Sequence, residues 1–422
     1  MRAFATLLLL CGAGCQLTET YVDLDEVLLA VPNPTPDEVD SSVLVIGDVG
    51  NAIDDQGRHL LEVLTREVRR YNAGQTLVVF LGDNIYPAGL REEHGTLNAE
   101  DRARLSVQIE AVERSGGSAI FVPGNHDYGA AGSEGILRQE AYVNRRGRRE
   151  NGDRFARFLP ATAGPGPAFV DWGQQLRLVL LDTQWWLEEP GRLVGSTTPV
   201  NDQVARERVI TASTETMRAA GSRHVVVAGH HPLKSTGPHG GFFPWDRHLF
   251  PLREKWIHAW APIPLIGTFY VLARNLGISD TDLSGRDYRR VCGQLEEAFR
   301  AVPGAPLVYV AGHEHSLQVL KGPADSVLVV SGAGSPAEGT AVSVSEDTLI
   351  ASPYHGFFRL DFLRDGRVRL ELIEASDPEQ ARSGAAVWLQ REGPNAGRGT
   401  VRYSAKVRTV DNPGSGECEA LS

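Results

Sequence analysis

Short apolar runs, each followed by glycine and then a polar side chain, recur along this 422-residue chain. Each run has the length and β-branched content of a buried strand, and the runs occupy 43–46, 78–81, 120–123, 225–228 and 308–311. The glycine lets the backbone turn sharply and approach another group closely. The residues after the five glycines are Asp48, Asp83, Asn125, His230 and His313. Because ligands tend to bind at the carboxyl ends of strands, the pattern predicts one metal site built from five strand ends.

Helical and strand-like segments alternate between these runs. The segments 57–72 and 99–114 carry a helical period, which predicts two helices. Further strands are expected at 176–182, 224–228, 306–311 and 326–331. Alternation of this kind is typical of an α/β domain.

Apolar and polar residues alternate near the C-terminus. The runs 357–362 and 368–372 flank the dipeptide Asp365-Gly366, which predicts a β-hairpin. Beyond about residue 376 the chain becomes polar and rich in glycine. We expect 376–422 to form a C-terminal extension whose last part is loosely ordered.

The N-terminus has the pattern of an export signal. Arg2 supplies a basic start, and Leu7 to Leu10 form a short apolar stretch before Cys15. The residues before Cys15 resemble the lipobox of bacterial lipoproteins, with Gly12 where leucine is usual. We expect a signal peptide over 1–15 and either a lipidated Cys15 that attaches the protein to a membrane or an ordinary cleaved secretory signal. The protein would then be periplasmic, an outer-membrane lipoprotein or secreted.

Residues 16–40 are expected to form a linker, and 41–375 the main domain. Prolines and many acidic residues mark the linker. An insert at 240–290 separates two of the strand-end blocks and contains the apolar stretch 260–273. Pro262, Pro264 and the short length argue against a membrane span. The insert is expected to be a subdomain or lid, and a membrane-contacting patch is the alternative.

Composition limits the class of partner. The net charge of −11 argues against nucleic acid as the main partner, because binding a phosphate backbone needs a basic surface. A small phosphate ester remains compatible, since a metal ion supplies positive charge locally. Outside the signal region the cysteines are Cys292 and Cys418, which either form one disulfide or remain as two thiols.

Read with their neighbours, the five strand ends form a recognisable signature. The blocks are Gly47-Asp48-Val49-Gly50, Gly82-Asp83-Asn84-Ile85-Tyr86, Gly124-Asn125-His126-Asp127, Ala228-Gly229-His230 and Gly312-His313-Glu314-His315. In order and sequence they resemble the signature of purple acid phosphatases, a branch of the calcineurin-like metallophosphoesterases. The spacing of His239 after His230 and the Ser316-Leu317-Gln318 run resemble the small, tartrate-resistant members.

The resemblance implies a set of metal ligands. Asp48, Tyr86 and His315 are similar to the ligands of the first metal. The second metal corresponds to Asn125, His230 and His313, and Asp83 to a carboxylate that bridges both. Tyr86 implies Fe(III) in the first position, paired with Fe(II), Zn(II) or Mn(II). With Fe(III) the site would carry a charge of about +1, which attracts a phosphomonoester. The alternative interpretation of Tyr86 is a packed aromatic residue after a strand.

Two further residues receive catalytic roles from the resemblance, and a third from its place next to one of them. His126 resembles the histidine that contacts the phosphate and helps to protonate the leaving group. His239 resembles a second active-site histidine, with a surface loop histidine as the alternative. Asp127 is expected to orient the ring of His126.

The resemblance also implies the fold and the reaction. The fold would be a four-layer αββα sandwich of two mixed sheets flanked by helices. The reaction would be hydrolysis of small phosphate monoesters by attack of a metal-bound hydroxide on phosphorus. Two alternatives stay open: a phosphodiesterase of the same superfamily acting on nucleotides or lipid head groups, and a non-catalytic surface protein that binds metal and phosphate.

Overall fold

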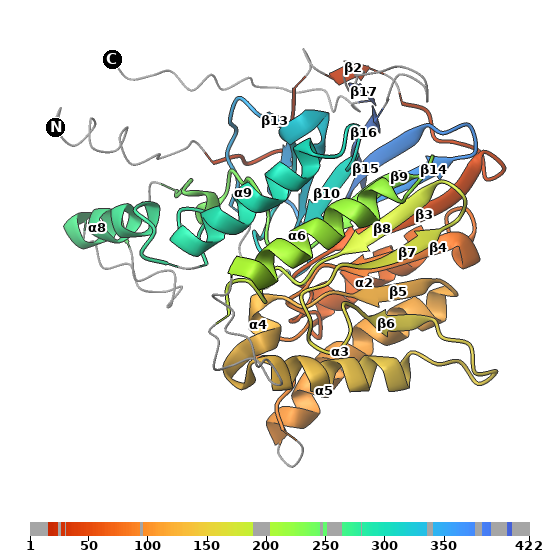
Figure 1. The fold of residues 1–422 in the computed structure, drawn as a ribbon, viewed down its shortest axis with the longest axis horizontal. Coiled ribbons are helices and arrows are strands. Elements are labelled where there is room, and N and C mark those ends of the chain that lie inside the picture. The colour runs from red at the N-terminus through yellow and green to blue at the C-terminus, as the bar shows by residue number, and fades with distance from the viewer. Residues whose placement is uncertain are drawn as a thin grey trace.

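Two large mixed sheets form the centre of the computed structural model (Figure 1). The structure describes residues 16–23, 27–29, 31–92, 96–188, 203–244, 248–250, 264–279, 281–335, 341–375, 382–389 and 403–406. In spatial order, sheet A contains β1 (Tyr21–Val22), β13 (Thr348–Ser352), β11 (Leu317–Lys321), β12 (Val327–Ser331), β10 (Val308–Ala311), β9 (His224–Ala228), β8 (Leu176–Leu180) and β7 (Ala168–Trp172).

Sheet B is the longer of the two. In spatial order it contains β2 (Val27–Leu29), β17 (Tyr403–Lys406), β16 (Arg382–Leu389), β15 (Val368–Glu374), β14 (Gly356–Leu363), β3 (Val39–Ile46), β4 (Thr76–Phe80), β5 (Ser118–Phe121) and β6 (Ala156–Phe158). The strands from β3 to β6 are parallel, and β14 pairs antiparallel with β3. The predicted hairpin is confirmed as β14 and β15, and β16 continues the sheet beyond residue 375.

Helices cover the outer face of each sheet (Figure 1). Sheet B carries α2 (Asp55–Val68), α3 (Thr96–Ser115) and α5 (Ser133–Arg146), whereas sheet A carries α6 (Gln203–Arg218) and α9 (Arg286–Arg300). The short α4 (Asn125–Tyr128) follows β5, and α8 (Pro264–Asn275) stands away from the sandwich in Figure 1. The expected arrangement of two mixed sheets with flanking helices is therefore confirmed.

The central strands are apolar on both faces, and β3 shows why. Val43 and Val45 pack between the sheets with residues of sheet A such as Val226. Leu44 and Ile46 point the other way, into the core beneath α2. Successive side chains of a strand alternate between its faces, so a strand covered on both sides is a continuous apolar run. The strand-end runs were recognisable in the sequence for this reason.

One outer region of sheet B is buried but charged. We call Arg359, Asp361, Arg369 and Glu371, with Arg70 and Glu67 at the end of α2, the sheet B ion cluster. The Arg359 Nε lies 2.6 Å from Asp361 Oδ1, and the Arg369 Nη1 lies 2.6 Å from Glu371 Oε2. The four strand residues are almost completely buried. Each of these charges meets an opposite charge within the chain.

Candidate metal centre

The carboxyl ends of five strands from the two sheets meet at one edge of the sandwich. Sheet B contributes β3, β4 and β5, and sheet A contributes β9 and β10. The loops after these strands are joined by backbone hydrogen bonds, among them Asp48 N–H to the Gly82 carbonyl at 2.9 Å. A Cβ on Gly47 would lie 2.9 Å from the Gly312 Cα, so a larger residue would push the two sheets apart. The glycines in the blocks thus permit the close approach that gathers the polar residues.

Three of the residues at these ends have left-handed backbones. Asp48, Asp83 and His313 have φ of 61°, 53° and 67°. Non-glycine residues rarely adopt this region, and such conformations cluster at functional sites where the surrounding structure enforces them. The strain indicates that the fold holds these side chains in a required direction.

The first group of donors is Asp48, Tyr86 and His315. The Tyr86 hydroxyl lies 3.0 Å from both Asp48 Oδ1 and His315 Nε2, and His315 Nε2 is 3.4 Å from the same carboxylate oxygen. Burial disfavours the charged form of Asp48, but hydrogen bonds from His315 and Tyr86 and the charge of the histidines outweigh it and lower its pKa. Asp48 is therefore held as a carboxylate beside a phenol and an imidazole.

The second group is Asn125, His230 and His313. His230 Nδ1 faces the Leu81 carbonyl at 2.8 Å, and His313 Nε2 faces the Thr281 carbonyl at 2.8 Å. A carbonyl only accepts hydrogen bonds, so these contacts place a ring proton on His230 Nδ1 and on His313 Nε2. The other nitrogens, His230 Nε2 and His313 Nδ1, lie 2.9 and 3.0 Å from Asn125 Oδ1.

Asp83 connects the two groups. Its Oδ1 lies 3.5 Å from His230 Nε2 and accepts the backbone N–H of His126 at 2.8 Å. Ligand atoms of Asp48, Asp83 and His230 lie within 4.8 Å of one another, and all three residues are buried. Asp83 therefore lies between the two groups of donors.

The donor set fits a pair of metal ions. Burial and the neighbouring histidines hold the pKa of His313 well below its usual value, so its imidazole is neutral and offers a lone pair. The second group directs two imidazole nitrogens and an amide oxygen toward the same small volume, beside two buried carboxylates. Acceptors facing one another without a proton repel, and a shared cation removes the repulsion. We call Asp48, Asp83, Tyr86, Asn125, His230, His313 and His315 the strand-end cluster.

The ring of His126 lies beside this cluster. It packs edge-to-face on Tyr86 at 4.7 Å between centroids, and its Nδ1 faces the Pro87 carbonyl at 2.8 Å. Burial opposes its protonation, but the negative charge of Asp83 and the Pro87 carbonyl outweigh it and raise the pKa of His126. Pro87, which the sequence did not reveal as a partner, fixes the ring.

The Asp127 carboxylate binds the backbone instead of the His126 ring. It accepts the N–H groups of Asn84 at 3.0 Å and Gly124 at 2.8 Å, and the side chain of Asn84 at 3.0 Å. Burial and the charge of Asp83 raise the pKa of Asp127 to about 7. These contacts tie the β4 loop to the β5 loop and hold Asp83 and Asn125 at their separation.

His239 reaches the cluster from the loop after β9. Its ring packs on that of His313 at 4.3 Å, and its Nδ1 lies 2.9 Å from Asp282 Oδ1. Arg274 in turn binds Asp282 through Nε at 2.7 Å. Neither Asp282 nor Arg274 was identified from the sequence, because both lie in the insert, where no repeated pattern marks them.

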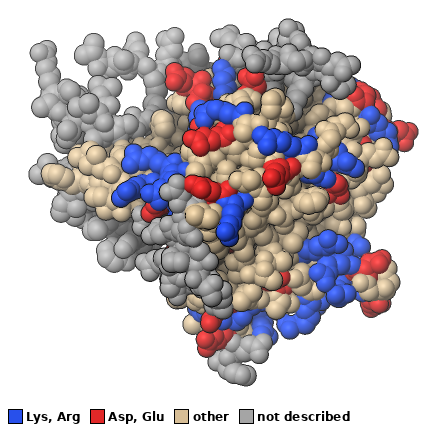
Figure 2. Space-filling view, in the orientation of Figure 1, with Lys and Arg blue, Asp and Glu red and all other residues tan. Residues whose placement is uncertain are grey.

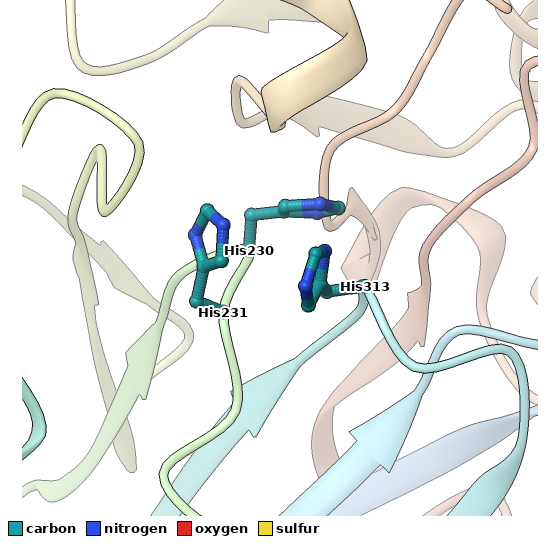
Figure 3. Close-up of side chains that lie close together, drawn as sticks. All are labelled: His230, His231 and His313. Carbon is teal, nitrogen blue, oxygen red and sulfur yellow. The ribbon is translucent and has the colours of Figure 1, made fainter. Parts of the chain in front are cut away.

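A further histidine, His231, lies among the ligand residues (Figure 3). It is buried, its ring stands at 85° to that of His230, and its Nδ1 lies 2.8 Å from Thr183 Oγ1. Burial lowers its pKa well below the usual value. Ring nitrogens of His230, His231 and His313 lie within 4.8 Å of one another.

A cavity of about 480 Å³ opens beside His239 and His315. Phe243, Tyr270 and Arg274 of the insert form part of its wall. The cavity therefore adjoins the strand-end cluster on the side of the insert, and its size is that of a small-molecule site.

Several predicted features lie outside the described residues. They are the signal peptide with Cys15, the tryptophans of the insert and Cys418. Cys292 is a free thiol in the described part of the chain. No described helix combines the length and apolar character needed to cross a bilayer.

Comparison with known proteins gives one family. The profile described as calcineurin-like phosphoesterase matches residues 41–317. No curated protein sequence matches the chain. Similar solved structures include GAP50, the anchor in the inner membrane complex of Plasmodium (13% identity, TM-score 0.48, 82% of this chain and 88% of that one). Others are purple acid phosphatase PPD1 from yellow lupin, Lupinus luteus (13%, 0.48, 84% and 54%), and PhoD (12%, 0.46, 89% and 76%).

Proposed function

The chain belongs to the calcineurin-like phosphoesterase family, and on this premise we propose that it is a metal-dependent phosphomonoesterase of the purple acid phosphatase type. The single observation that supports this choice is the Tyr86 hydroxyl, 3.0 Å from both Asp48 Oδ1 and His315 Nε2. A phenol among carboxylate and imidazole donors suits a trivalent ion, whereas the imidazole and amide donors opposite suit a divalent one.

Each residue of the cluster has a part in this proposal. Asp48, Tyr86 and His315 hold an iron(III) ion, Asn125, His230 and His313 hold Fe(II), Zn(II) or Mn(II), and Asp83 is shared. When bound, such a pair supplies positive charge for the phosphoryl oxygens and lowers the pKa of water. The residues of the chain set the positions of the donors and exclude water from all but one side.

Two histidines act on the substrate in this proposal. The Pro87 carbonyl accepts the Nδ1 proton of His126, so Nε2 is the atom that delivers a proton to the leaving oxygen. His239, which packs on His313 and lines the cavity, contacts the phosphoryl group. Asp127 acts as a positioning residue for the two loops.

The test uses a chromogenic aryl phosphomonoester and the matching diester with the metal-loaded protein. We expect the wild-type protein to hydrolyse the monoester and Asn125→Ala to lose more than about a hundredfold of this activity. Mutation of a residue that supports a metal ligand costs about 10–100-fold, and loss of a ligand itself should cost more. Turnover of the diester alone would favour a phosphodiesterase, the second candidate, which the insert-lined cavity supports because it has room for a second ester group. Binding of metal and phosphate without turnover would favour a non-catalytic protein.

The iron assignment has its own readout. A phenolate bound to iron(III) absorbs visible light by charge transfer, so the iron-loaded protein should be coloured and Tyr86→Phe colourless at the same iron content. Retention of the colour in Tyr86→Phe would remove the iron(III)–tyrosine assignment without touching the phosphatase activity.

Export is part of the proposal. The basic start, the short apolar stretch and Cys15 support it. Mass spectrometry of the mature protein would distinguish a diacylated Cys15 from a simple cleavage, and an unprocessed Met1 would contradict both.

A further inference from the structure

A short strap of the insert, Thr281–Leu283, holds both His313 and His239. The Thr281 carbonyl lies 2.8 Å from His313 Nε2, and the Asp282 Oδ1 lies 2.9 Å from His239 Nδ1. The backbone N–H of Leu283 donates to the His239 carbonyl at 3.0 Å. Three consecutive residues thus contact one proposed metal ligand and one proposed substrate-binding histidine.

The Asp282 side chain is built to stay in this position. It is only 3% exposed, and Arg274 from α8 binds both of its oxygens, with Nε to Oδ2 at 2.7 Å and Nη2 to Oδ1. A bidentate guanidinium fixes a carboxylate in direction as well as in distance. The rings of Phe243 and Tyr270 lie 4.9 and 5.8 Å from the guanidinium, which holds Arg274 itself.

The consequence falls on the His239 ring. A carboxylate that only accepts hydrogen bonds requires the proton on Nδ1, and the remaining Nε2 then faces away from Asp282. His239 lines the 480 Å³ cavity together with His315, so Nε2 is the ring nitrogen available to a ligand there. Without Asp282 the ring would exchange between tautomers and rotate about its side-chain bonds.

We propose that Asp282 is a positioning residue for phosphate-ester hydrolysis: held by Arg274, it fixes the orientation of His239 so that Nε2 faces the ester bound in the cavity. The insert then contributes Asp282 and Arg274 to the proposed catalytic site in addition to part of the cavity wall. This inference rests on the proposed phosphatase function, and it deepens the part given there to His239.

The first experiment is a double-mutant cycle of Asp282→Asn and His239→Asn, with Asp287→Asn as the matched control. Asp287 is exposed on α9 and pairs with Arg290 at 3.1 Å, away from the cavity. We expect Asp282→Asn to lower kcat/KM by about 10–100-fold, mainly through kcat, as is usual for carboxylates that orient a histidine. In the His239→Asn background the same change should cost less than about twofold, and Asp287→Asn should have no effect. An equal loss in both backgrounds would overturn the proposal, because Asp282 would then act through the fold.

Two further measurements separate this inference from the function on which it rests. Long-range ¹H–¹⁵N NMR of histidine-labelled, metal-free protein should show His239 as the Nδ1–H tautomer, and Asp282→Asn should shift it to a mixture. An unchanged tautomer in Asp282→Asn would overturn the proposal whether or not the protein hydrolyses esters. If Asp282→Asn fails to fold, Arg274→Lys keeps the charge but loses the bidentate grip and should give a smaller loss of kcat with the same metal content. Wild-type protein without turnover would refute the phosphatase function alone.

Discussion

The sheet B ion cluster and the strand-end cluster are both buried and rich in charge, yet they differ in completeness. In the sheet B ion cluster three arginines meet three carboxylates, and Ser42 Oγ joins Arg359 and Asp361 with 2.7 Å bonds to each. In the strand-end cluster two buried carboxylates are surrounded by imidazoles, a phenol and an amide. Among the described residues, each carboxylate of the first cluster is paired with an arginine, whereas no arginine or lysine is paired with the carboxylates of the second.

The difference separates structure from function on physical grounds. A buried ion pair that is fully hydrogen-bonded contributes order and specificity to the fold, and breaking it leaves an uncompensated charge. A buried group of acceptors with strained backbones costs stability until a cation arrives. Stability should therefore depend on the first cluster, and metal binding on the second.

The largest effect is expected from Asp361→Ala. The change leaves Arg359 and Arg369 buried without their shared carboxylate, and we expect the free energy of unfolding to fall by about 3–5 kcal/mol. Chemical denaturation measures it. Glu296→Gln, which removes the half-buried partner of the exposed Arg300 on α9, is the control and should cost less than about 1 kcal/mol. A loss of turnover per folded molecule in Asp361→Ala would contradict the view that the sheet B ion cluster acts on stability alone.

The next effect concerns acid. Burial disfavours the Glu371 carboxylate, but the hydrogen bond from Arg369 and the charges of Arg70 and Arg369 outweigh it and lower its pKa to about 2. Its contribution to stability is complete above the unfolded pKa of 4.5 and is lost as the pH falls from there through about 2. The free energies of unfolding of wild type and Glu371→Gln, measured with urea, should therefore differ less as the pH falls through this window, by on the order of 3 kcal/mol. Parallel curves would mean that Glu371 is not held ionised.

Metal addition should stabilise the protein through the strand-end cluster alone. A metal at a hundred times its Kd adds about 2.7 kcal/mol to the free energy of unfolding. Thermal unfolding with and without added Zn(II) tests this. We expect Asp361→Ala to keep the increment and Asn125→Ala to lose most of it. Equal increments in wild type and Asn125→Ala would place the metal elsewhere.

The smallest effect has the opposite sign to a usual core substitution. Asp83→Asn removes one of two buried carboxylates whose oxygens lie within 4.8 Å, and its Oδ1 still accepts the His126 N–H. We expect the metal-free variant to be more stable than wild type by about 1 kcal/mol. The metal-loaded variant should be less stable than loaded wild type. Destabilisation of the metal-free form would show that the negative charge of Asp83 stabilises the fold without metal.

The sequence predicted which residues would lie together at the strand ends, because this arrangement depends on local patterns. An apolar run, a glycine and a ligand type are adjacent in the chain, so β3, β4, β5, β9 and β10 and the residues after them could be read directly. The parts that were missed depend on contacts between distant segments. Asp282 and Arg274 meet His239 only after the insert has folded back, and the Pro87 carbonyl is a backbone group that no side-chain pattern reports.

The sheet B ion cluster was hidden for a different reason. In β14 and β15 the polar residues alternate with apolar ones, a pattern that ordinarily indicates a face exposed to water. The end of α2 instead covers that face, with Arg70 bound to Glu371 and the Arg359 Nη1 2.6 Å from the Glu67 carbonyl. Charged side chains of both signs also lie on the surface seen in Figure 2. The presence of both signs in a strand therefore does not tell whether the strand is exposed or buried.

The place of β3 between β4 and β14 has a consequence for biosynthesis. Val45 pairs with Phe358, so one edge of β3 stays bare until the ribosome has made most of the chain, which takes on the order of tens of seconds. His313 and His315 emerge in the same late interval. The nascent protein therefore carries an open, apolar strand edge for most of its synthesis. It is exposed to aggregation until sheet B is completed, at nearly the same time as the strand-end cluster.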